Sequence, residues 1–296
     1  MKIVFIGSVI FSKFLLKSLF KIKKITIVGV CTKNKSKFNS DFYNLGNLCK
    51  KKKIPYIYCK KINTPMTINW IKIKKPDYIF CFGWSELLSS SILKIPKKGS
   101  IGYHPSELPK NKGRNPIIWS LVLGLKFAGS SFFFMNKKPD SGKIISQQRI
   151  KIENKDNSNS LYKKLIKVSV KQLKILINKL DEKQFKNFKK GQIPKSNYWR
   201  KRNFDDGQVD WRMSAKNIYN LTRALSKPYP YSHFYFRGKK IEIIQTKIIS
   251  FKKNNIEPGK VLAIKKKKLF VKCGKGAISI IKYKPNLNIK VNDYLI

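Results

Sequence analysis

Short apolar runs alternate with segments of helical spacing through the first 82 residues. The runs occupy residues 2–6, 24–31, 54–58 and 78–82. Between the first two runs, one face of a helix is suggested by the spacing of Phe11, Phe14, Leu15 and Leu19. This alternation predicts an α/β fold with a doubly wound, mostly parallel sheet. The turn at Gly7-Ser8 has no Gly-x-Gly-x-x-Gly pattern, so it does not indicate a dinucleotide site.

The following stretch predicts a mixed edge for the same sheet. We expect a helix over residues 115–124, with a proline near its first turn. Strand-like runs over residues 129–135 and 143–150 flank a Pro/Gly turn, which predicts a hairpin-like pair. A long helix is expected over residues 160–180, with its lysines on a solvated face.

The composition of the chain changes after Gly191. A polar, aromatic linker is followed by a helix that Ser214 is expected to cap. From Tyr231 onward, short strand-like runs are broken by glycine and asparagine, which predicts a small antiparallel β-barrel. We therefore divide the chain into a larger domain over residues 1–200 and a linker helix plus barrel over residues 201–296.

The charge of the chain allows two interpretations. It carries 65 Lys and Arg against 15 Asp and Glu, a formal net charge of +50, as in many proteins that bind nucleic acid. Lysine nevertheless occurs in every complete block of ten residues except 81–90, and this spread also fits a compositional bias toward AT-rich codons. Weak, nonspecific binding to RNA is expected from the charge alone, and it should collapse with salt.

Three further features limit the class of protein. There is no uncharged apolar run of 18 residues, so no membrane partner is expected. The segment Met1–Gly7 lacks a small-residue cleavage site and fits a first buried strand better than a signal peptide. The five cysteines are odd in number and show no Cys-x-x-Cys spacing, which predicts a reduced, cytoplasmic protein without a structural metal.

His104 and Asp140 are the strongest candidates for acid/base chemistry. His104, one of only two histidines, follows a strand-like run, and Asp140 lies in a Pro/Gly turn after another such run. Sites in open α/β sheets collect at the carboxyl ends of strands. We therefore expect the two side chains to face one pocket, close enough for a direct or single-water hydrogen bond.

These residues are part of a pattern that resembles the folate-dependent formyltransferase superfamily, of the sugar-nucleotide and methionyl-tRNA formyltransferase types. The matching motifs are His104, Leu108-Pro109, Lys110-Asn-Lys-Gly-Arg114 with Pro116 and Trp119, Asp140-Ser-Gly142 with Ile144, Val209-Asp-Trp211, and Arg223-Ala-Leu-Ser-Lys-Pro-Tyr-Pro230. The resemblance covers nearly the whole chain, and its specificity comes from the combination. It implies a catalytic formyltransferase domain over residues 1–200, with N10-formyltetrahydrofolate as the formyl donor.

The resemblance also implies roles for individual residues. His104 would stabilise the developing oxyanion, and Asp140 would accept the amine proton or raise the pKa of His104. The residues implied in binding the folate are Phe82, Gly83, Trp84, Leu87, Arg114 and Gly142. No metal is implied.

One position departs from the family pattern. The family places an asparagine two residues before the histidine, and this chain has Gly102 there. That asparagine would supply a second oxyanion donor, and the loss of such a donor costs about 10²–10³ in rate. Asn111 and Asn115, on the loop that follows, are candidate replacements; a weak or inactive enzyme is the alternative.

The acceptor amine separates two branches of the family. Methionyl-tRNA formyltransferases typically carry a longer loop, rich in Gly, Arg, Lys and Pro, after the second strand, whereas residues 32–43 here are short and lack Pro and Gly. This favours the sugar-nucleotide branch, in which the acceptor is an amino-deoxy sugar nucleotide. Formylation of initiator Met-tRNA remains the alternative. A nucleic-acid-binding protein without catalysis is disfavoured by the diffuse lysine pattern.

Overall fold

The computed structural model describes residues 1–37, 39–182 and 196–296, which divide into two compact units. The first unit comprises residues 1–113, 128–150 and 163–199. The second unit comprises residues 114–127, 151–162 and 200–296. Two segments of the larger domain expected from the sequence therefore group with the C-terminal residues.

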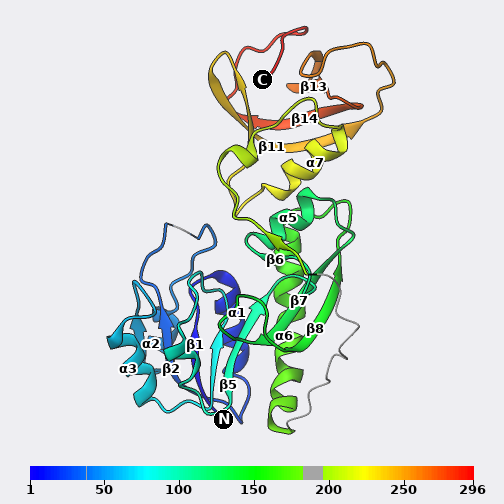
Figure 1. The fold of residues 1–296 in the computed structure, drawn as a ribbon. Helices are drawn as coiled ribbons and strands as arrows, with labels where there is room; N and C mark the ends of the chain where they lie inside the picture. The colour runs from blue at the N-terminus through cyan, green and yellow to red at the C-terminus, as the bar shows by residue number, and fades with distance from the viewer. Residues whose placement is uncertain (38, 183–195) are drawn as a thin grey trace. The chain divides into compact units, whose positions relative to one another are not determined.

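A seven-stranded sheet forms the centre of the first unit (Figure 1). Its strands are β1 (Lys2–Ile6), β2 (Thr26–Thr32), β3 (Tyr56–Tyr58), β4 (Tyr78–Cys81), β5 (Gly99–His104), β7 (Phe127–Phe134) and β8 (Ile144–Lys151). They lie in the order β3-β2-β1-β4-β5-β7-β8. The pairs among β1 to β5 are parallel, whereas β7 runs antiparallel to β5. The prediction of a mostly parallel sheet with a mixed edge is confirmed.

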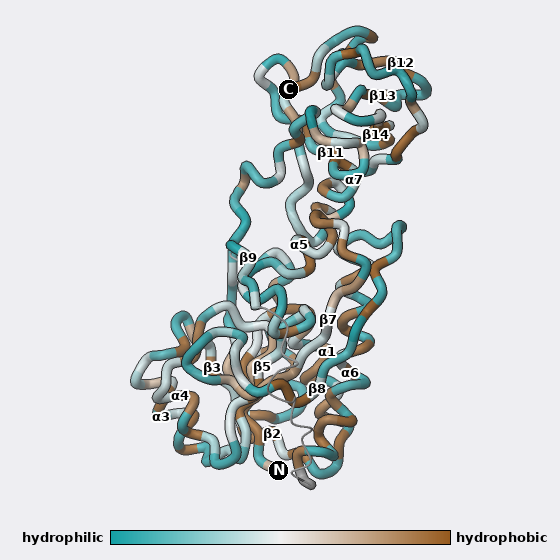
Figure 2. Tube along the Cα trace, turned by 45° about the vertical axis from the view of Figure 1, so that its right-hand side comes forward, coloured by the Kyte–Doolittle hydropathy of each residue, from teal (hydrophilic) through white to brown (hydrophobic). Residues whose placement is uncertain are grey.

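Apolar side chains of the strands contribute to two cores, because successive side chains of a strand point to opposite faces of the sheet. The associated helices are α1 (Ile10–Leu19), α2 (Gly46–Lys51), α3 (Pro65–Ile73), α4 (Ser90–Leu93) and α6 (Ser158–Glu182). Val4 of β1 packs in one cluster with Ile71 of α3 and Ile92 of α4. Along α6, hydrophilic and hydrophobic residues alternate, as expected for a helix with one buried face (Figure 2).

Aromatic rings fill the core that contains Phe5. The ring of Phe82 lies 5.3 Å from that of Phe80 and 5.3 Å from that of Phe132, measured between centroids. Tyr103 of β5 stacks on Phe11 of α1 at 4.3 Å. These contacts hold Tyr103, near the end of β5, against α1 and the aromatic core. The residue after Tyr103 is His104, the last residue of β5.

A short parallel ribbon completes the first unit. It pairs β6 (Lys112–Gly113) with β9 (Tyr198–Trp199), although the two strands are far apart in the sequence. Gly113 has φ +98°, and a Cβ there would lie 2.3 Å from the backbone oxygen of Trp199. Only glycine fits so close an approach of two backbones.

The second unit is built on a five-stranded antiparallel sheet in the order β10-β11-β14-β13-β12. Its strands are β10 (Ser232–Phe236), β11 (Lys239–Ile249), β12 (Val261–Lys265), β13 (Lys268–Lys272) and β14 (Ala277–Lys284). Its helices are α5 (Pro116–Val122), the short 3₁₀ helix η1 (Asp205–Gly207) and α7 (Ala215–Ala224). Ser214 caps α7 by accepting a hydrogen bond from the Asn217 N–H, as predicted. A small antiparallel domain is thus confirmed.

All five cysteines are free and buried: Cys31, Cys49, Cys59 and Cys81 in the first unit, and Cys273 in the second. Across residues 1–37, 39–182 and 196–296, no helix has the length and apolar character needed to cross a membrane. The same residues contain no group of three or more His, Cys, Asp or Glu that could hold a metal ion.

Candidate functional site

His104 is the last residue of β5 and is only 6% exposed. Its Nε2 lies 3.0 Å from the backbone oxygen of Asn111. Because a carbonyl oxygen only accepts, Nε2 carries a proton and donates it. Nε2 of the imidazole is therefore engaged by Asn111, and Nδ1 faces a second neighbour on the other side of the ring.

That neighbour is Asp140, whose Oδ1 lies 3.6 Å from the Nδ1 of His104. The other carboxylate oxygen, Oδ2, accepts a hydrogen bond of 3.1 Å from the backbone N–H of Gly113. Asp140 has φ +51°, in the left-handed region. The structure thus brings the two predicted residues together, with His104 buried and Asp140 partly exposed.

The strand-end argument explains His104 but not Asp140. Because β7 runs antiparallel to β5, Phe134 at the end of β7 pairs with Ile101, while His104 pairs with Ser131. The carboxyl end of β7 therefore lies at the opposite edge from that of β5. Asp140 reaches His104 because the turn before β8 comes back to it, which the alternation of strands and helices did not predict.

Two opposing influences act on the pKa of His104. Burial lowers this pKa and dominates, whereas the carboxylate of Asp140 and the carbonyl of Asn111 both raise it. The resemblance implied that Asp140 raises the pKa of the histidine. Asp140 does act in that direction, but burial outweighs it. The imidazole of His104 is consequently harder to protonate than an exposed histidine.

The predicted folate residues at 82–87 differ in their surroundings. The side chain of Phe82 is fully buried in the aromatic core, and its contact with a folate stays a prediction. Gly83 has φ +74°, and a Cβ there would lie 2.3 Å from Cγ2 of Val9. Leu87 is 63% exposed. The Nε1 of Trp84 is buried, and no residue in the described ranges provides it with a hydrogen-bond acceptor.

Gly142 and Arg114, the other two predicted folate residues, lie in different units. A Cβ at Gly142 would lie 1.5 Å from the backbone oxygen of Phe134, so glycine is required there for the turn into β8. Arg114 belongs to the second unit. Their contacts with a folate stay predictions.

Comparison with known proteins identifies the family. The family model "Formyl transferase" matches residues 1–177, and the model "Formyl transferase, C-terminal domain" matches residues 203–294. The chain belongs to the formyl transferase family. A curated relative, the bifunctional polymyxin resistance protein ArnA of Wigglesworthia glossinidia brevipalpis, is 43% identical over 236 residues. That match covers 78% of this chain and 35% of the relative's length.

Solved structures share the fold of this chain. WlaRD, a sugar 3N-formyl transferase crystallised with dTDP and 5-N-formyl-THF, has a TM-score of 0.70 and 18% identity, over 97% of this chain and 99% of that one. The N-formyltransferase of Helicobacter canadensis, with folinic acid and dTDP-3-aminofucose, has a TM-score of 0.68 and 17% identity, over 95% and 98%. The methionyl-tRNA formyltransferase of Clostridium thermocellum has a TM-score of 0.61 and 18% identity, over 84% and 94%.

The departure at Gly102 has a steric counterpart in the structure. A Cβ at Gly102 would lie 2.8 Å from Cζ of Phe133 and 3.0 Å from Cγ of Met135. The two candidate replacements use their side-chain oxygens in other contacts, whereas an oxyanion would need their Nδ2 donors, so both stay predictions. The Oδ1 of Asn111 accepts from Nδ2 of Asn197 at 3.2 Å, and the Oδ1 of Asn115 accepts from the N–H of Arg202 at 3.1 Å.

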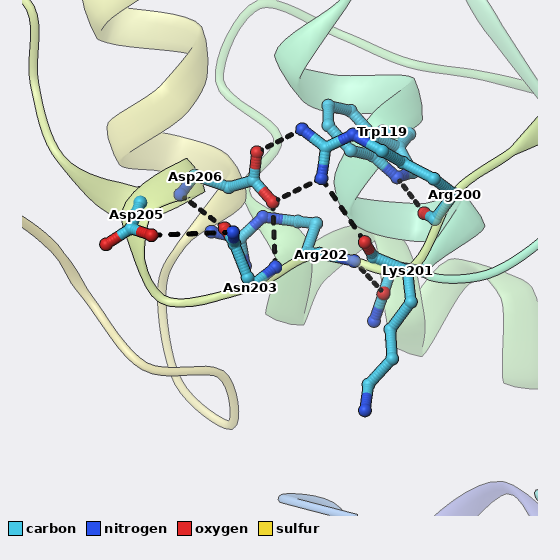
Figure 3. Close-up of polar contacts among 8 residues, drawn as sticks. Trp119, Arg200, Lys201, Arg202, Asn203, Asp205 and Asp206 are labelled. Carbon is cyan, nitrogen blue, oxygen red and sulfur yellow. Dashed lines mark hydrogen bonds and ion pairs between the residues drawn. The ribbon is translucent and has the colours of Figure 1, made fainter.

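The second unit contains a separate cavity of about 1000 Å³. Trp119 lines it and donates its Nε1–H to the backbone oxygen of Arg200 at 3.0 Å. The guanidinium of Arg200 lies 5.2 Å from the Trp119 ring and pairs with the carboxylate of Asp206 (Figure 3). These contacts tie the polar linker to α5 within the second unit, which gives a structural reason for Trp119 in the motif.

Proposed function

We propose that this protein transfers a formyl group from N10-formyltetrahydrofolate to the primary amine of an amino-deoxy sugar nucleotide, in the cytoplasm. The observation that supports this best is the pair in which Nδ1 of the buried His104 lies 3.6 Å from Oδ1 of Asp140. A histidine beside a carboxylate in a low-dielectric setting can both hold and receive protons near neutral pH. The family assignment supplies the reaction in which the pair acts.

The reaction sets clear requirements for this pair. A bond forms between the amine nitrogen and the formyl carbon, and the bond from that carbon to N10 breaks. Negative charge builds on the formyl oxygen, a proton leaves the amine, and a proton reaches N10. In our proposal Asp140 accepts the amine proton, while His104 stabilises the charge on the oxygen.

The residues proposed to hold the folate include one unsatisfied donor. The indole N–H of Trp84 is buried and has no acceptor within the described part of the chain. An unsatisfied buried donor costs about 1–3 kcal/mol, and a ring nitrogen or carbonyl of a bound heterocycle would satisfy it. Gly83, Leu87 and Gly142 of the first unit belong to the same proposed set, and the folate contacts of Phe82 and Arg114 stay predictions.

The choice of a sugar nucleotide as acceptor rests on the short loop after β2 and on the solved neighbours. Asp41 accepts a hydrogen bond from the N–H of Ile10 at 2.9 Å, and the N–H of Tyr43 donates to Ser8 at 2.9 Å. The end of the loop is thus pinned to the start of α1, which leaves little chain to grip an acceptor stem. WlaRD and the Helicobacter canadensis protein, named as sugar and aminofucose-bound formyltransferases, align over at least 95% of this chain.

A direct assay tests this proposal. The protein is supplied with N10-formyltetrahydrofolate and either a panel of amino-deoxy sugar nucleotides or methionyl initiator tRNA, and formylated product is measured. We expect turnover of at least one sugar nucleotide, and a loss of about 10²–10⁴-fold in His104→Gln and Asp140→Asn. His233→Gln, which changes the other histidine, is the matched control. Full activity of Asp140→Asn would remove the pair from catalysis.

Formylation of initiator tRNA is the second candidate. It is favoured by the net charge of +50 and by the fold shared with the Clostridium thermocellum enzyme. Binding to RNA does not separate the two candidates, because a chain of this charge binds polyanions nonspecifically at low salt. Faster turnover of Met-tRNA than of every sugar nucleotide tested would make this candidate the correct one.

A further inference from the structure

Three consecutive residues of the first unit, Asn111 to Gly113, contact the His104–Asp140 pair or the residue beside it. The carbonyl of Asn111 accepts from Nε2 of His104 at 3.0 Å. The ammonium of Lys112 lies 3.4 Å from the hydroxyl oxygen of Ser141. The N–H of Gly113 donates to Oδ2 of Asp140 at 3.1 Å. The position of this segment therefore sets the orientation of both members of the pair.

The segment does not hold this conformation by local preference alone. Asn111 and Gly113 have φ of +59° and +98°, and such backbone angles persist in an asparagine only where neighbouring contacts fix them. Besides the pairing of β6 with β9, three of these contacts come from one distant residue, Asn197. Its Oδ1 accepts from the N–H of Asn111 at 2.8 Å, and its Nδ2 donates to Oδ1 of Asn111 at 3.2 Å. Its backbone oxygen accepts from the N–H of Lys112 at 3.1 Å.

We propose that Asn197 is a positioning residue for formyl transfer, which holds Asn111–Gly113 so that His104 and Asp140 keep their relative geometry. This inference rests on the proposed function of the pair. Asn197 contacts neither His104 nor Asp140 and acts only through the segment. We expect Asn197 to affect the rate because a displacement of about 1 Å at a catalytic site can cost roughly 100-fold in rate.

The groups around His104 predict how its pKa would change if the segment Asn111–Gly113 moved. Asp140 faces Nδ1 of His104, and Lys112 lies one residue from the carbonyl that faces Nε2. Tyr198 lies beneath Lys112, with its ring centroid 5.2 Å from Nζ. Of these contacts, the carbonyl of Asn111 raises the pKa of His104. If the segment loosens, this contribution is lost and the histidine gives up its proton at lower pH.

The test is the pH dependence of kcat in Asn197→Ala. We expect kcat to fall by about 10-fold to 100-fold, and the limb of the profile assigned to His104 to move to lower pH. Asn197→Asp keeps an acceptor for the N–H of Asn111, and we expect it to recover part of the loss. The matched control is Asn44→Ala, which removes a partly buried asparagine whose Nδ2 also bonds another asparagine, Asn34.

The following outcomes would contradict the proposal or the function on which it rests. A lower kcat with the limb unmoved would overturn the proposal, because a general loss of structure lowers activity without shifting a titration. Unchanged activity in Asn197→Ala would also overturn it. Asp140→Asn is measured alongside: if Asp140→Asn is inactive and Asn197→Ala is normal, the inference about Asn197 fails while the proposed function stands. If Asp140→Asn is fully active, the proposed function itself fails.

Discussion

Adding a side chain at Gly102 should destabilise the protein by a calculable amount. Gly102 lies in β5 and pairs with Phe133 of β7. A Cβ at this position would lie 2.8 Å from Cζ of Phe133, where ordinary contacts begin at 3.4 Å, so the overlap is about 0.6 Å. Phe133 is buried and cannot swing into solvent. Overpacking of this kind costs about 1–3 kcal/mol.

Urea unfolding of Gly102→Ala and Gly102→Asn measures this cost. We expect both variants to lose about 1–3 kcal/mol of unfolding free energy, and Gly102→Asn to gain no activity although it restores the amide of the family pattern. Phe133→Leu, combined with Gly102→Asn, makes room for the side chain, so the two changes should be less than additive. A Gly102→Asn protein as stable as the parent would refute the steric reasoning.

Three further predictions follow from individual contacts. Ser12→Ala removes a buried hydroxyl that donates to the backbone oxygen of Phe82 at 2.5 Å, so urea unfolding should show a loss of about 1–3 kcal/mol. Arg223→Met removes the guanidinium that donates to backbone oxygens of the second unit at 2.9 and 3.0 Å, and the thermal midpoint should fall. Arg200 holds the pKa of Asp206 below its usual range. The ionised carboxylate therefore stabilises the folded protein at pH values above its unfolded pKa of about 3.9. This stabilisation is lost as the pH falls through the lower pKa that Asp206 has in the folded protein. Below about pH 4, thermal melting of Asp206→Asn should therefore decline less steeply than that of the parent.

The sequence predicted the parts of the site that depend on local pattern. His104 follows an apolar run, and such a run in an α/β chain ends at the functional edge of the sheet. The side chain of Phe82 shows the limit of this argument. An aromatic residue at the end of a buried strand has the same pattern whether its ring packs in the core or borders a slot, and here Phe5, Phe80 and Phe132 enclose it.

Other features depend on contacts between distant residues and have no local signal. Asn197 lies in a polar stretch without periodicity, and its partner Asn111 is 86 residues away. The direction of β7 is likewise set by its pairing with β5, so the approach of Asp140 to His104 was predicted without its structural reason. The grouping of residues 114–127 with the C-terminal residues reflects packing of α5 on α7, which single-segment patterns do not encode.

The buried cysteines allow local unfolding of the protein to be followed by the reaction of their thiols. Burial raises the pKa of Cys81 and of Cys273 to about 12, so in the closed state these thiols are neither accessible nor present as reactive thiolates. Each becomes available to a thiol reagent only when its surroundings open. Because Cys273 is the one cysteine of the second unit, mass spectrometry of labelled peptides would time the opening of each unit separately, without any introduced probe.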